Sequence, residues 1–337
     1  MRRAAILFGS LALAATGCLI GTAQAAPAPA PTGSHSTSVS AADQRAAVRF
    51  WTADRLHGAR EMAAPATAAA SAPSPAGHAS AAVSRPLTEV PPVAAPAEAA
   101  VRSAKSVAAS APTAWTGGGL ISTTAGKVFF QRADGGTFTC SATVANSDNK
   151  SVVLTAGHCV VDAGTGEVYR NWVFIPGYAN GNRPFGTFTA TQLFHLDQYV
   201  STGGNANWDF AFARVGQVDG RSLVDTVGAQ GIAFNSATGR HVHSFGYGGS
   251  AEEGSGERLN HCEGDEFIDG GRPGSTMWGI DCVQSGGSSG GGFLADFDTA
   301  AGAGALVGNI SVSAGANEYH PTLGNEALDV YRQAGAV

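Results

Sequence analysis

Three short segments of this chain carry side chains that together could activate an alcohol as a nucleophile. Ser289 lies inside the glycine-rich run 286–292, and His158 stands just after the apolar run 152–154 and directly before a cysteine. Between them, Asp209 opens the strand-like segment 209–212. The order histidine, aspartate, serine is one of the chain orders in which nucleophilic triads occur. The spacing therefore predicts Ser289, His158 and Asp209 as catalytic residues.

The chemistry explains why these residue types are needed. A serine hydroxyl is a poor nucleophile until a base takes its proton, and a neutral imidazole suits that role near pH 7. We therefore assign Ser289 as nucleophile, His158 as general base and then acid, and Asp209 as the carboxylate that orients the imidazole. The backbone amides of Gly287 and Ser289 are the candidates for the oxyanion hole, because glycine reaches the backbone angles that such a turn needs.

The same segments resemble the signatures of the chymotrypsin-like (trypsin-like) serine protease family. They read Thr-Ala-Gly-His-Cys at 155–159, Asp-Phe-Ala at 209–211 and Gly-Ser-Ser-Gly-Gly at 287–291. Segments 174–181 and 184–186 are similar to the secreted bacterial branch that includes glutamyl endopeptidases and actinobacterial peptidases. The resemblance implies two packed antiparallel β-barrels with the triad in the cleft between them. It also implies a serine endopeptidase that hydrolyses peptide bonds through an acyl-enzyme intermediate.

Some positions depart from the family pattern. Ser288 stands where most animal members carry an aspartate that pairs with a newly cut N-terminus, so this chain cannot use that activation route. In relatives the residue six before the nucleophile lies at the base of the primary pocket, and here it is Val283, which does not favour cleavage after Lys or Arg. We take Val283, Ser311 and Ser313 as pocket candidates, with a preference for small or apolar residues.

The five cysteines fit an exported protein. Cys18 lies in the apolar start of the chain, and cleavage after residue 25 leaves an even set of four, as expected in an oxidising compartment. Within the family framework, a Cys140–Cys159 bridge would anchor the catalytic histidine, and a Cys262–Cys282 bridge would close a loop before the nucleophile. A cysteine nucleophile is disfavoured, because no cysteine has both a free-thiol argument and a separate base.

The first 25 residues read as a signal peptide. A basic start at Arg2 and Arg3 precedes the apolar run 4–21, and 23–25 is a small-x-small cleavage site. Lipid attachment at Cys18 is the alternative. We therefore expect a secreted, extracellular protein that has no membrane association after the signal is removed.

Residues 26–114 have the composition of a prosegment without a core of its own. They hold 11 of the 15 prolines in the chain, and Phe50 and Trp51 are their only aromatic residues. Such a segment has too little apolar bulk to offset ordering entropy, so we expect it to be largely disordered. Residues 41–62 are proline-free and have a helical spacing of apolar residues. This helix either has no fixed role or docks on the folded protease before processing, and 50–56 resemble prosegments of actinobacterial relatives.

Residues 115–337 have the size of one domain and an all-β pattern, and the resemblance implies that they form the serine protease domain. They contain 40 of the 46 glycines, and their 11 Lys/Arg against 21 Asp/Glu give no basic surface for nucleic acid. A C-terminal helix is predicted over 325–333. We expect a monomer that acts on polypeptides. Short β-branched or aromatic runs bounded by turn residues predict strands at 127–131, 137–144, 151–154, 172–175, 187–194, 209–215, 241–247, 292–297 and 305–313.

Other interpretations of these residues are possible. The run Gly287-x-Ser289-x-Gly291 also fits the nucleophile elbow of α/β-hydrolases, with Asp296 or Asp298 and His320 in the required order, which would make the protein an esterase. That fold needs a helix after the serine, and three glycines are a poor helix start. A catalytically silent binding module on a protease fold is a further alternative, although silent relatives usually lose a triad member. Asp162, Asp197 and Asp219 are the weaker alternatives to Asp209.

No cofactor or metal is expected from the sequence. His241 and His243 lie on one face of a predicted strand, with His261 and Cys262 further along, which could suggest zinc. Two imidazoles without a third ligand at a recognisable spacing are more often surface or core residues. His195 and His320 have no better claim to be ligands.

Overall fold

The structure is a computed structural model of the 337-residue chain that describes residues 33–62, 86–97, 99 and 111–337. The predicted signal peptide, its cleavage site, Cys18 and the middle of the predicted prosegment lie outside the described residues. Among the residues that are described, no helix is both long and apolar enough to cross a membrane.

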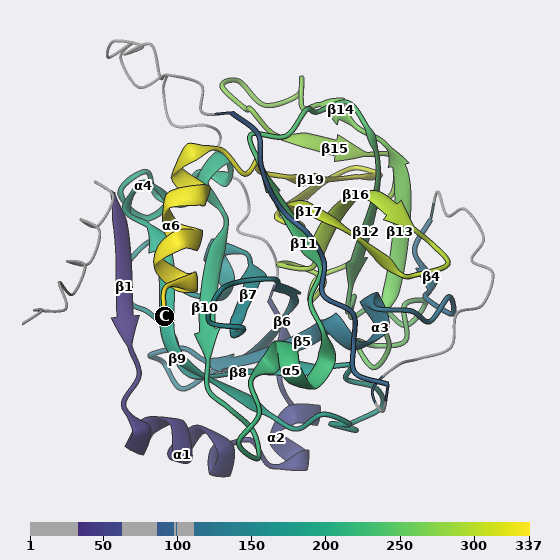
Figure 1. The fold of residues 1–337 in the computed structure, drawn as a ribbon. Helices are drawn as coiled ribbons and strands as arrows, with labels where there is room; N and C mark the ends of the chain where they lie inside the picture. The colour runs from purple at the N-terminus through teal and green to yellow at the C-terminus, as the bar shows by residue number, and fades with distance from the viewer. Residues whose placement is uncertain (1–32, 63–85, 98, 100–110) are drawn as a thin grey trace, which may run out of the picture. The chain divides into compact units, whose positions relative to one another are not determined.

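The first half of residues 115–337 forms a closed six-stranded antiparallel barrel (Figure 1). The ring runs β9-β10-β7-β6-β5-β8, and pairing between β8 and β9 closes it. Alternate residues of each strand point inward, so that Val128, Val153 and Phe174 fill one buried cluster. The strands are β5 (Ala125–Gln131), β6 (Thr137–Ala145), β7 (Val152–Thr155), β8 (Arg170–Pro176), β9 (Phe188–Leu196) and β10 (Ala211–Val215).

The second half is built from two further sheets. A seven-stranded sheet has the order β3-β11-β17-β16-β12-β13-β4, and a four-stranded sheet has the order β14-β15-β19-β18. Their strands are β11 (Gly231–Phe234), β12 (His241–Gly246), β13 (Asn260–Asp265), β14 (Phe267–Ile268), β15 (Trp278–Ile280), β16 (Gly292–Asp298), β17 (Ala303–Asn309), β18 (Val312–Ala314) and β19 (Asn317–His320). Pairing is antiparallel except between β11 and β17. The expected all-β class is confirmed, and the sheet of the first half closes into a barrel.

The C-terminal helix α6 (Asn325–Gly335) confirms the prediction over 325–333 and packs against β9, β10 and β11 (Figure 1). Leu328 and Tyr331 bury their side chains there, and the Arg214 guanidinium donates to the carbonyls of Gln333 and Ala334. A cation at the C-terminus of a helix is favourable because the last carbonyls lack partners within the helix. The short helices are α3 (Ile121–Thr124), α4 (Asp197–Ser201), α5 (Leu223–Val227), η1 (Gly157–Cys159) and η2 (Ala206–Trp208).

All nine predicted strands are present, with two differences in detail. The run 305–313 is not one strand but β17 followed by β18, because Ile310 donates to the carbonyl of Gly291 and Ser311 donates to that of Tyr319. Asp209 is not in a strand: it ends η2, and β10 begins two residues later. Within residues 115–337, the strands that the sequence pattern missed are β11, β13, β14, β15 and β19, which are short or contain polar and glycine residues.

Residues 33–62, called here the N-terminal segment, pack on the barrel. They contain β1 (Ser34–Ser38), which pairs with β9, then α1 (Ala41–Phe50), α2 (Ala53–His57) and β2 (Arg60–Glu61), which pairs with β6 in parallel. The helix predicted over 41–62 is confirmed for α1 and α2. The two helices are separate because the Thr52 hydroxyl caps the start of α2. The prediction is wrong beyond His57, because α2 ends at Gly58 and the chain continues into the strand β2.

Two more parts of the expected linker are strands. β3 (Thr88–Val90) pairs with β11, and β4 (Thr113–Ala114) pairs with β13, so both extend the seven-stranded sheet at its edges. The described parts of 26–114 are therefore more ordered than their composition indicates. They have no core of their own and instead pack on the part formed by residues 115–337, as the complete burial of Trp51 illustrates.

Candidate active site

The predicted base, His158, is held at the end of β7. The chain leaves this buried strand and forms the short helix η1, which contains Gly157, His158 and Cys159. Both predicted disulfides, Cys140–Cys159 and Cys262–Cys282, are present, and the first ties η1 back to β6. Trp172 Nε1 also donates to the carbonyl of Cys159 at 3.0 Å. The backbone that carries the imidazole is therefore fixed from two sides.

The predicted carboxylate, Asp209, contacts this histidine directly. Its Oδ2 lies 2.7 Å from His158 Nδ1, and its Oδ1 accepts the backbone N–H of His158 at 2.8 Å. Two residues that the sequence interpretation gave no such role complete the arrangement. Ser311 Oγ donates to Asp209 Oδ2 at 2.6 Å, and Asn309 Nδ2 donates to the Asp209 carbonyl at 3.0 Å. All four side chains are buried, so the carboxylate is desolvated, and His158 and Ser311 supply its hydrogen bonds, while Asn309 holds the Asp209 backbone.

This arrangement sets the tautomer of the imidazole. With Nδ1–H donated to Asp209, the other ring nitrogen, Nε2, presents a lone pair. Nε2 of His158 is buried and has no hydrogen-bond partner among the described residues. A buried polar atom without a partner is unusual, and at a catalytic position it is available to a substrate or a nucleophile. The geometry therefore leaves Nε2 as the ring nitrogen that can act as a base.

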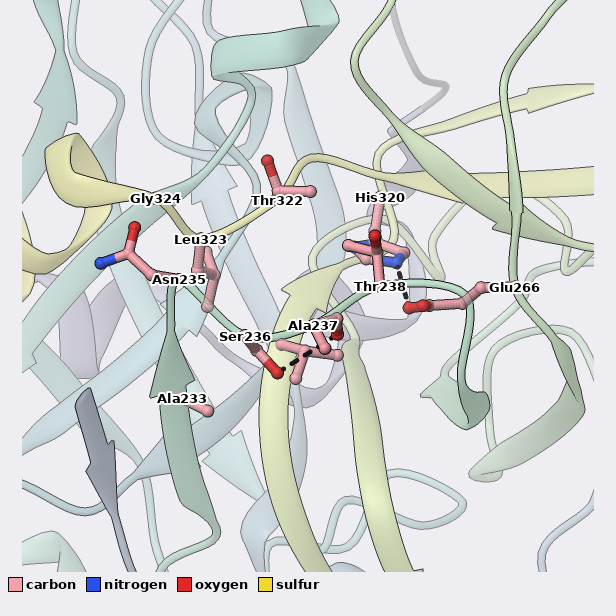
Figure 2. A pocket seen from close by; sticks show the side chains of 11 residues that line it. Ala233, Asn235, Ser236, Ala237, Thr238, Glu266, His320, Thr322, Leu323 and Gly324 are labelled. Atoms are coloured by element: carbon pink, nitrogen blue, oxygen red, sulfur yellow. Dashed lines mark hydrogen bonds and ion pairs between the residues drawn. The ribbon is translucent and has the colours of Figure 1, made fainter. Parts of the chain in front are cut away.

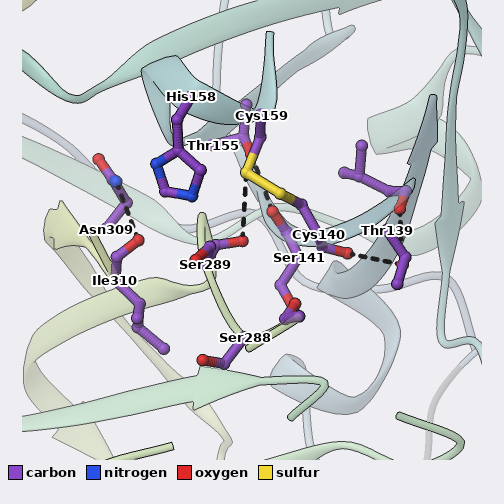
Figure 3. Close-up of a disulfide and its surroundings, with 12 residues drawn as sticks. Thr139, Cys140, Ser141, Thr155, His158, Cys159, Ser288, Ser289, Asn309 and Ile310 are labelled. Atoms are coloured by element: carbon purple, nitrogen blue, oxygen red, sulfur yellow. Dashed lines mark hydrogen bonds between the residues drawn. A yellow bond between two sulfur atoms is a disulfide. The ribbon is translucent and has the colours of Figure 1, made fainter. Parts of the chain in front are cut away.

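Ser289 lies beside this histidine (Figure 3), but no hydrogen bond joins its hydroxyl to His158 Nε2. Glycines in the left-handed region stand before and after it. Gly287 has φ +94° and Gly290 has φ +87°. A Cβ on Gly290 would lie 2.3 Å from the Ser141 carbonyl and 2.3 Å from Thr155 Oγ1, so no larger residue fits there. The Ser289 carbonyl accepts from the Ser141 amide at 2.7 Å, and the Cys159 sulfur lies 3.6 Å from the same oxygen (Figure 3). The turn thus connects Ser289 to the strand and the disulfide that hold His158.

One of the two predicted oxyanion donors is already occupied. The Gly287 amide donates to the carbonyl of Met62 at 3.2 Å, at the end of the N-terminal segment. Met62 is held there because its own N–H donates to Thr139 of β6 at 2.9 Å. A Cβ on Gly287 would also meet the side chain of Glu61 at 3.2 Å. The sequence interpretation missed this contact, since nothing local to Met62 indicates it.

The three pocket candidates lie in different surroundings. Val283 is half-buried and Ser313 is exposed, whereas the Ser311 hydroxyl is engaged with Asp209. Opposite Ser313, on β19, the fully buried Glu318 accepts from the Gln284 amide at 2.9 Å and from the Ser244 hydroxyl. Burial raises the pKa of Glu318 to about 7, because desolvation outweighs these hydrogen bonds.

The α/β-hydrolase alternative is wrong in its geometry. The strand β16, not a helix, follows Ser289. His320 Nε2 lies 2.9 Å from Glu266 rather than from either proposed aspartate, and Asp296 pairs with Arg240. His320 and Glu266 line a cavity of about 220 Å³ near β11 (Figure 2). None of the three triad candidates lines this cavity.

The alternative carboxylates lie elsewhere in the described structure. Asp162 pairs with Arg132 at 2.6 Å, while Asp197 and Asp219 are exposed. His195 is buried, stacks on His35 and lies 3.1 Å from the Leu196 carbonyl through Nδ1.

Comparison with known proteins agrees with this geometry. No family model matches the chain, and no curated protein does. Among solved structures, the protease Anisep from Arthrobacter nicotinovorans is 33% identical with a TM-score of 0.61, and the match covers 67% of this chain and all of that one. The thermostable serine protease AL20 from an extremophilic microorganism is 33% identical with a TM-score of 0.59, covering 65% and 99%.

A Glu endopeptidase shares the fold, at 18% identity and a TM-score of 0.53, over 67% of this chain and 97% of that one. The two structures at 33% identity establish the relationship, because one of them is matched over its entire length. The chain therefore belongs to the bacterial chymotrypsin-like serine proteases and is a serine-type endopeptidase with a trypsin-like fold.

Proposed function

We propose that the protein is a secreted serine endopeptidase whose catalytic triad is Ser289, His158 and Asp209. The observation that carries this proposal is the bidentate contact of Asp209 with the Nδ1 and the backbone N–H of His158. It leaves Nε2 buried and without a hydrogen-bond partner among the described residues, on the ring that lies beside the Ser289 turn. Nε2 of His195 is also buried without a partner in the described structure, but His195 Nδ1 lies against the Leu196 carbonyl rather than a carboxylate. The Asp209 contact, together with the unpaired Nε2, therefore distinguishes His158.

The reaction follows from these positions. Ser289 Oγ attacks the carbonyl carbon of the peptide bond while His158 Nε2 takes the hydroxyl proton. The amides of Gly287 and Ser289 donate to the oxyanion, and Asp209 stabilises the imidazolium. His158 then gives the proton to the leaving amine, which leaves an acyl-enzyme at Ser289. A water molecule, deprotonated by the same imidazole, releases the acid product and regenerates the serine.

The test uses covalent labelling by a fluorophosphonate, which reacts with activated serines. The chain freed of the residues before 115 should label, and Ser289→Ala should abolish labelling. Ser288→Ala is the matched control, since its hydroxyl only donates to the Ser285 carbonyl at 2.7 Å and should not be needed. If the processed chain never labels, the catalytically silent binding module is the correct interpretation.

We also propose that the enzyme is made as a zymogen inhibited by its N-terminal segment. The support is the Met62 carbonyl, which occupies the Gly287 amide that a substrate oxyanion would need. The Glu61 side chain lies over the same turn, as its closeness to Gly287 and Gly249 indicates. A peptide cannot use this donor until residues 60–62 leave.

The anchor of this segment is apolar. Ala47, Trp51 and Leu56 pack with barrel residues Phe129 and Tyr178 in one buried cluster. Trp51 Nε1 donates to the Asn171 carbonyl at 2.6 Å, and Arg183 donates to the Trp51 carbonyl at 2.9 Å. Removal of the segment by proteolysis is then the activating step. No ion pair with a newly formed N-terminus is needed at position 288, because Ser288 has no carboxylate to form one.

The disulfides favour an exported protein. All four cysteines outside the predicted signal peptide are in disulfides, which persist in oxidising surroundings. Together with the signal-like residues 1–25, this supports secretion. Mass spectrometry of the N-terminus of the protein found in culture medium distinguishes cleavage after residue 25 from lipid attachment at Cys18.

A further inference from the structure

One face of the β12–β13 hairpin gathers three histidines and a glutamate away from the active site. The antiparallel register places His243 opposite Glu263 and His241 opposite Asp265. His261 lies two residues before Glu263 on β13, so it shares the same face. The sequence interpretation considered two of these histidines but had no third ligand, because the partner across the hairpin depends on the register.

Three potential ligand atoms converge in this cluster. His243 Nδ1 lies 2.9 Å from His261 Nε2 and 3.1 Å from Glu263 Oε2. The remaining separation, between His261 Nε2 and Glu263 Oε2, is 3.6 Å. Cys262 is not available as a ligand, since it is in a disulfide with Cys282.

Protons alone satisfy this arrangement poorly. If His243 Nδ1 carries the proton, the lone pairs of His261 Nε2 and Glu263 Oε2 compete for it while facing each other. If only His261 Nε2 carries the proton, it can donate to His243 Nδ1, but the Glu263 carboxylate then faces that same nitrogen lone pair across 3.1 Å. If both rings carry a proton here, two N–H groups face each other across 2.9 Å. A cation at the centre accepts all three lone pairs at once.

The surroundings favour neutral imidazoles. His261 is 1% exposed, and its ring packs against Trp115 and Phe245, while His243 packs against Phe297. Two neutral nitrogens and one carboxylate oxygen are a ligand set that suits zinc.

We propose that His243, His261 and Glu263 bind a divalent transition-metal ion of the zinc class. A tetrahedral ion with bonds of about 2.0–2.1 Å places its ligand atoms roughly 3.3 Å apart, close to the observed separations. His241 is the neighbour for the fourth position, because ligand atoms of His241, His243 and Glu263 lie within 4.8 Å of one another. Its ring is half-exposed, so water can take that position instead.

The ion has a structural role. It joins β12 to β13, and β13 in turn pairs with β4 through Asn260 and His261. Trp115, directly after β4, covers His261. The site therefore fixes the edge of the sheet where the N-terminal region meets the protease part, and it takes no part in peptide hydrolysis.

The test uses the full chain with Ser289→Ala to prevent self-cleavage. After incubation with Zn²⁺ and dialysis against metal-free buffer, elemental analysis should find about one zinc per chain, and the melting temperature should be higher than without metal. Glu263→Gln keeps the shape of the side chain but should weaken zinc binding by more than the roughly 10- to 100-fold that loss of an outer partner costs. His35→Gln is the control, because His35 is exposed and distant from the cluster.

A second measurement does not depend on any cluster variant. Co²⁺ titrated into the same protein should give the intense visible absorption of a tetrahedral site, saturating at one equivalent and displaced by Zn²⁺. The proposal is overturned if no zinc is retained and Co²⁺ gives no such band. It is equally overturned if folded Glu263→Gln retains as much zinc as the His35→Gln control.

Discussion

Replacing Trp51 with alanine should release the N-terminal segment and expose the active site without any cleavage. Trp51 is 1% exposed, its ring lies 5.4 Å from that of Phe129, and its Nε1 donates to the Asn171 carbonyl. Truncating a buried aromatic residue costs about 3–5 kcal/mol, and here that loss falls on the docking of α1 and α2. At about 1.4 kcal/mol per factor of ten, the undocked population should increase roughly 100- to 4,000-fold.

The assay is the rate of fluorophosphonate labelling at Ser289, followed on the full-length band in the first minutes after mixing. The rate should increase in Trp51→Ala toward that of the processed enzyme, because the Met62 carbonyl then leaves the Gly287 amide. Val48→Ala on the same helix is the matched control, since Val48 is 49% exposed and contributes little to docking.

Two results would refute this reasoning. One is a folded Trp51→Ala precursor that labels no faster than Val48→Ala, while the processed enzyme labels rapidly. The other is a wild-type precursor that already labels as fast as the processed enzyme. Circular dichroism of each variant shows whether the protease part remains folded, which separates release of the segment from general unfolding.

Three further predictions concern the protease part. Ser311→Ala removes the hydroxyl that donates to Asp209, and a hydrogen bond to a charged group contributes about 1.5 kcal/mol. Steady-state kinetics should therefore show kcat decreased about 10-fold with little change in KM. Glu318 has a pKa raised to about 7 by burial, so the native state binds the extra proton and the unfolding free energy should decrease as pH rises from about 4.5 to 7. Glu318→Gln should flatten this dependence, and above pH 7 its unfolding free energy should exceed that of wild type by up to about 3 kcal/mol. Urea denaturation at pH 5 and pH 8 measures this, and the same pH dependence in the variant and wild type would contradict the prediction. Gly290→Ala should lower the melting temperature and abolish activity because its Cβ meets backbone at 2.3 Å, whereas Gly270→Ala, with open space around it, should change neither.

The sequence indicated much of the protease part because its signals are local. Alternating β-branched and aromatic residues between glycine-rich turns predicted the strands that the structure contains. Asp209 could be selected over Asp162, Asp197 and Asp219 from its position before an apolar strand, and it is the carboxylate that contacts His158. The residue types in the 286–292 run reflect the backbone angles that the Ser289 turn needs.

Other features have no local signal. Ser311 and Asp209 are separated by 102 positions, and the break between β17 and β18 that brings them together depends on hydrogen bonds to Gly291 and Tyr319. The order of the N-terminal segment was underestimated for the same reason. Its composition cannot provide a core, and the apolar surface that buries Trp51 comes from the barrel.

By itself, the amino-acid order determined which residues could do chemistry and which short runs would be strands, since side-chain type and alternation act over a few positions. Only the tertiary structure decided which carbonyl occupies the Gly287 amide and which carboxylate faces His243. The Met62 carbonyl is brought to Gly287 by the docking of a distant segment, and the register between β12 and β13 places Glu263 opposite His243.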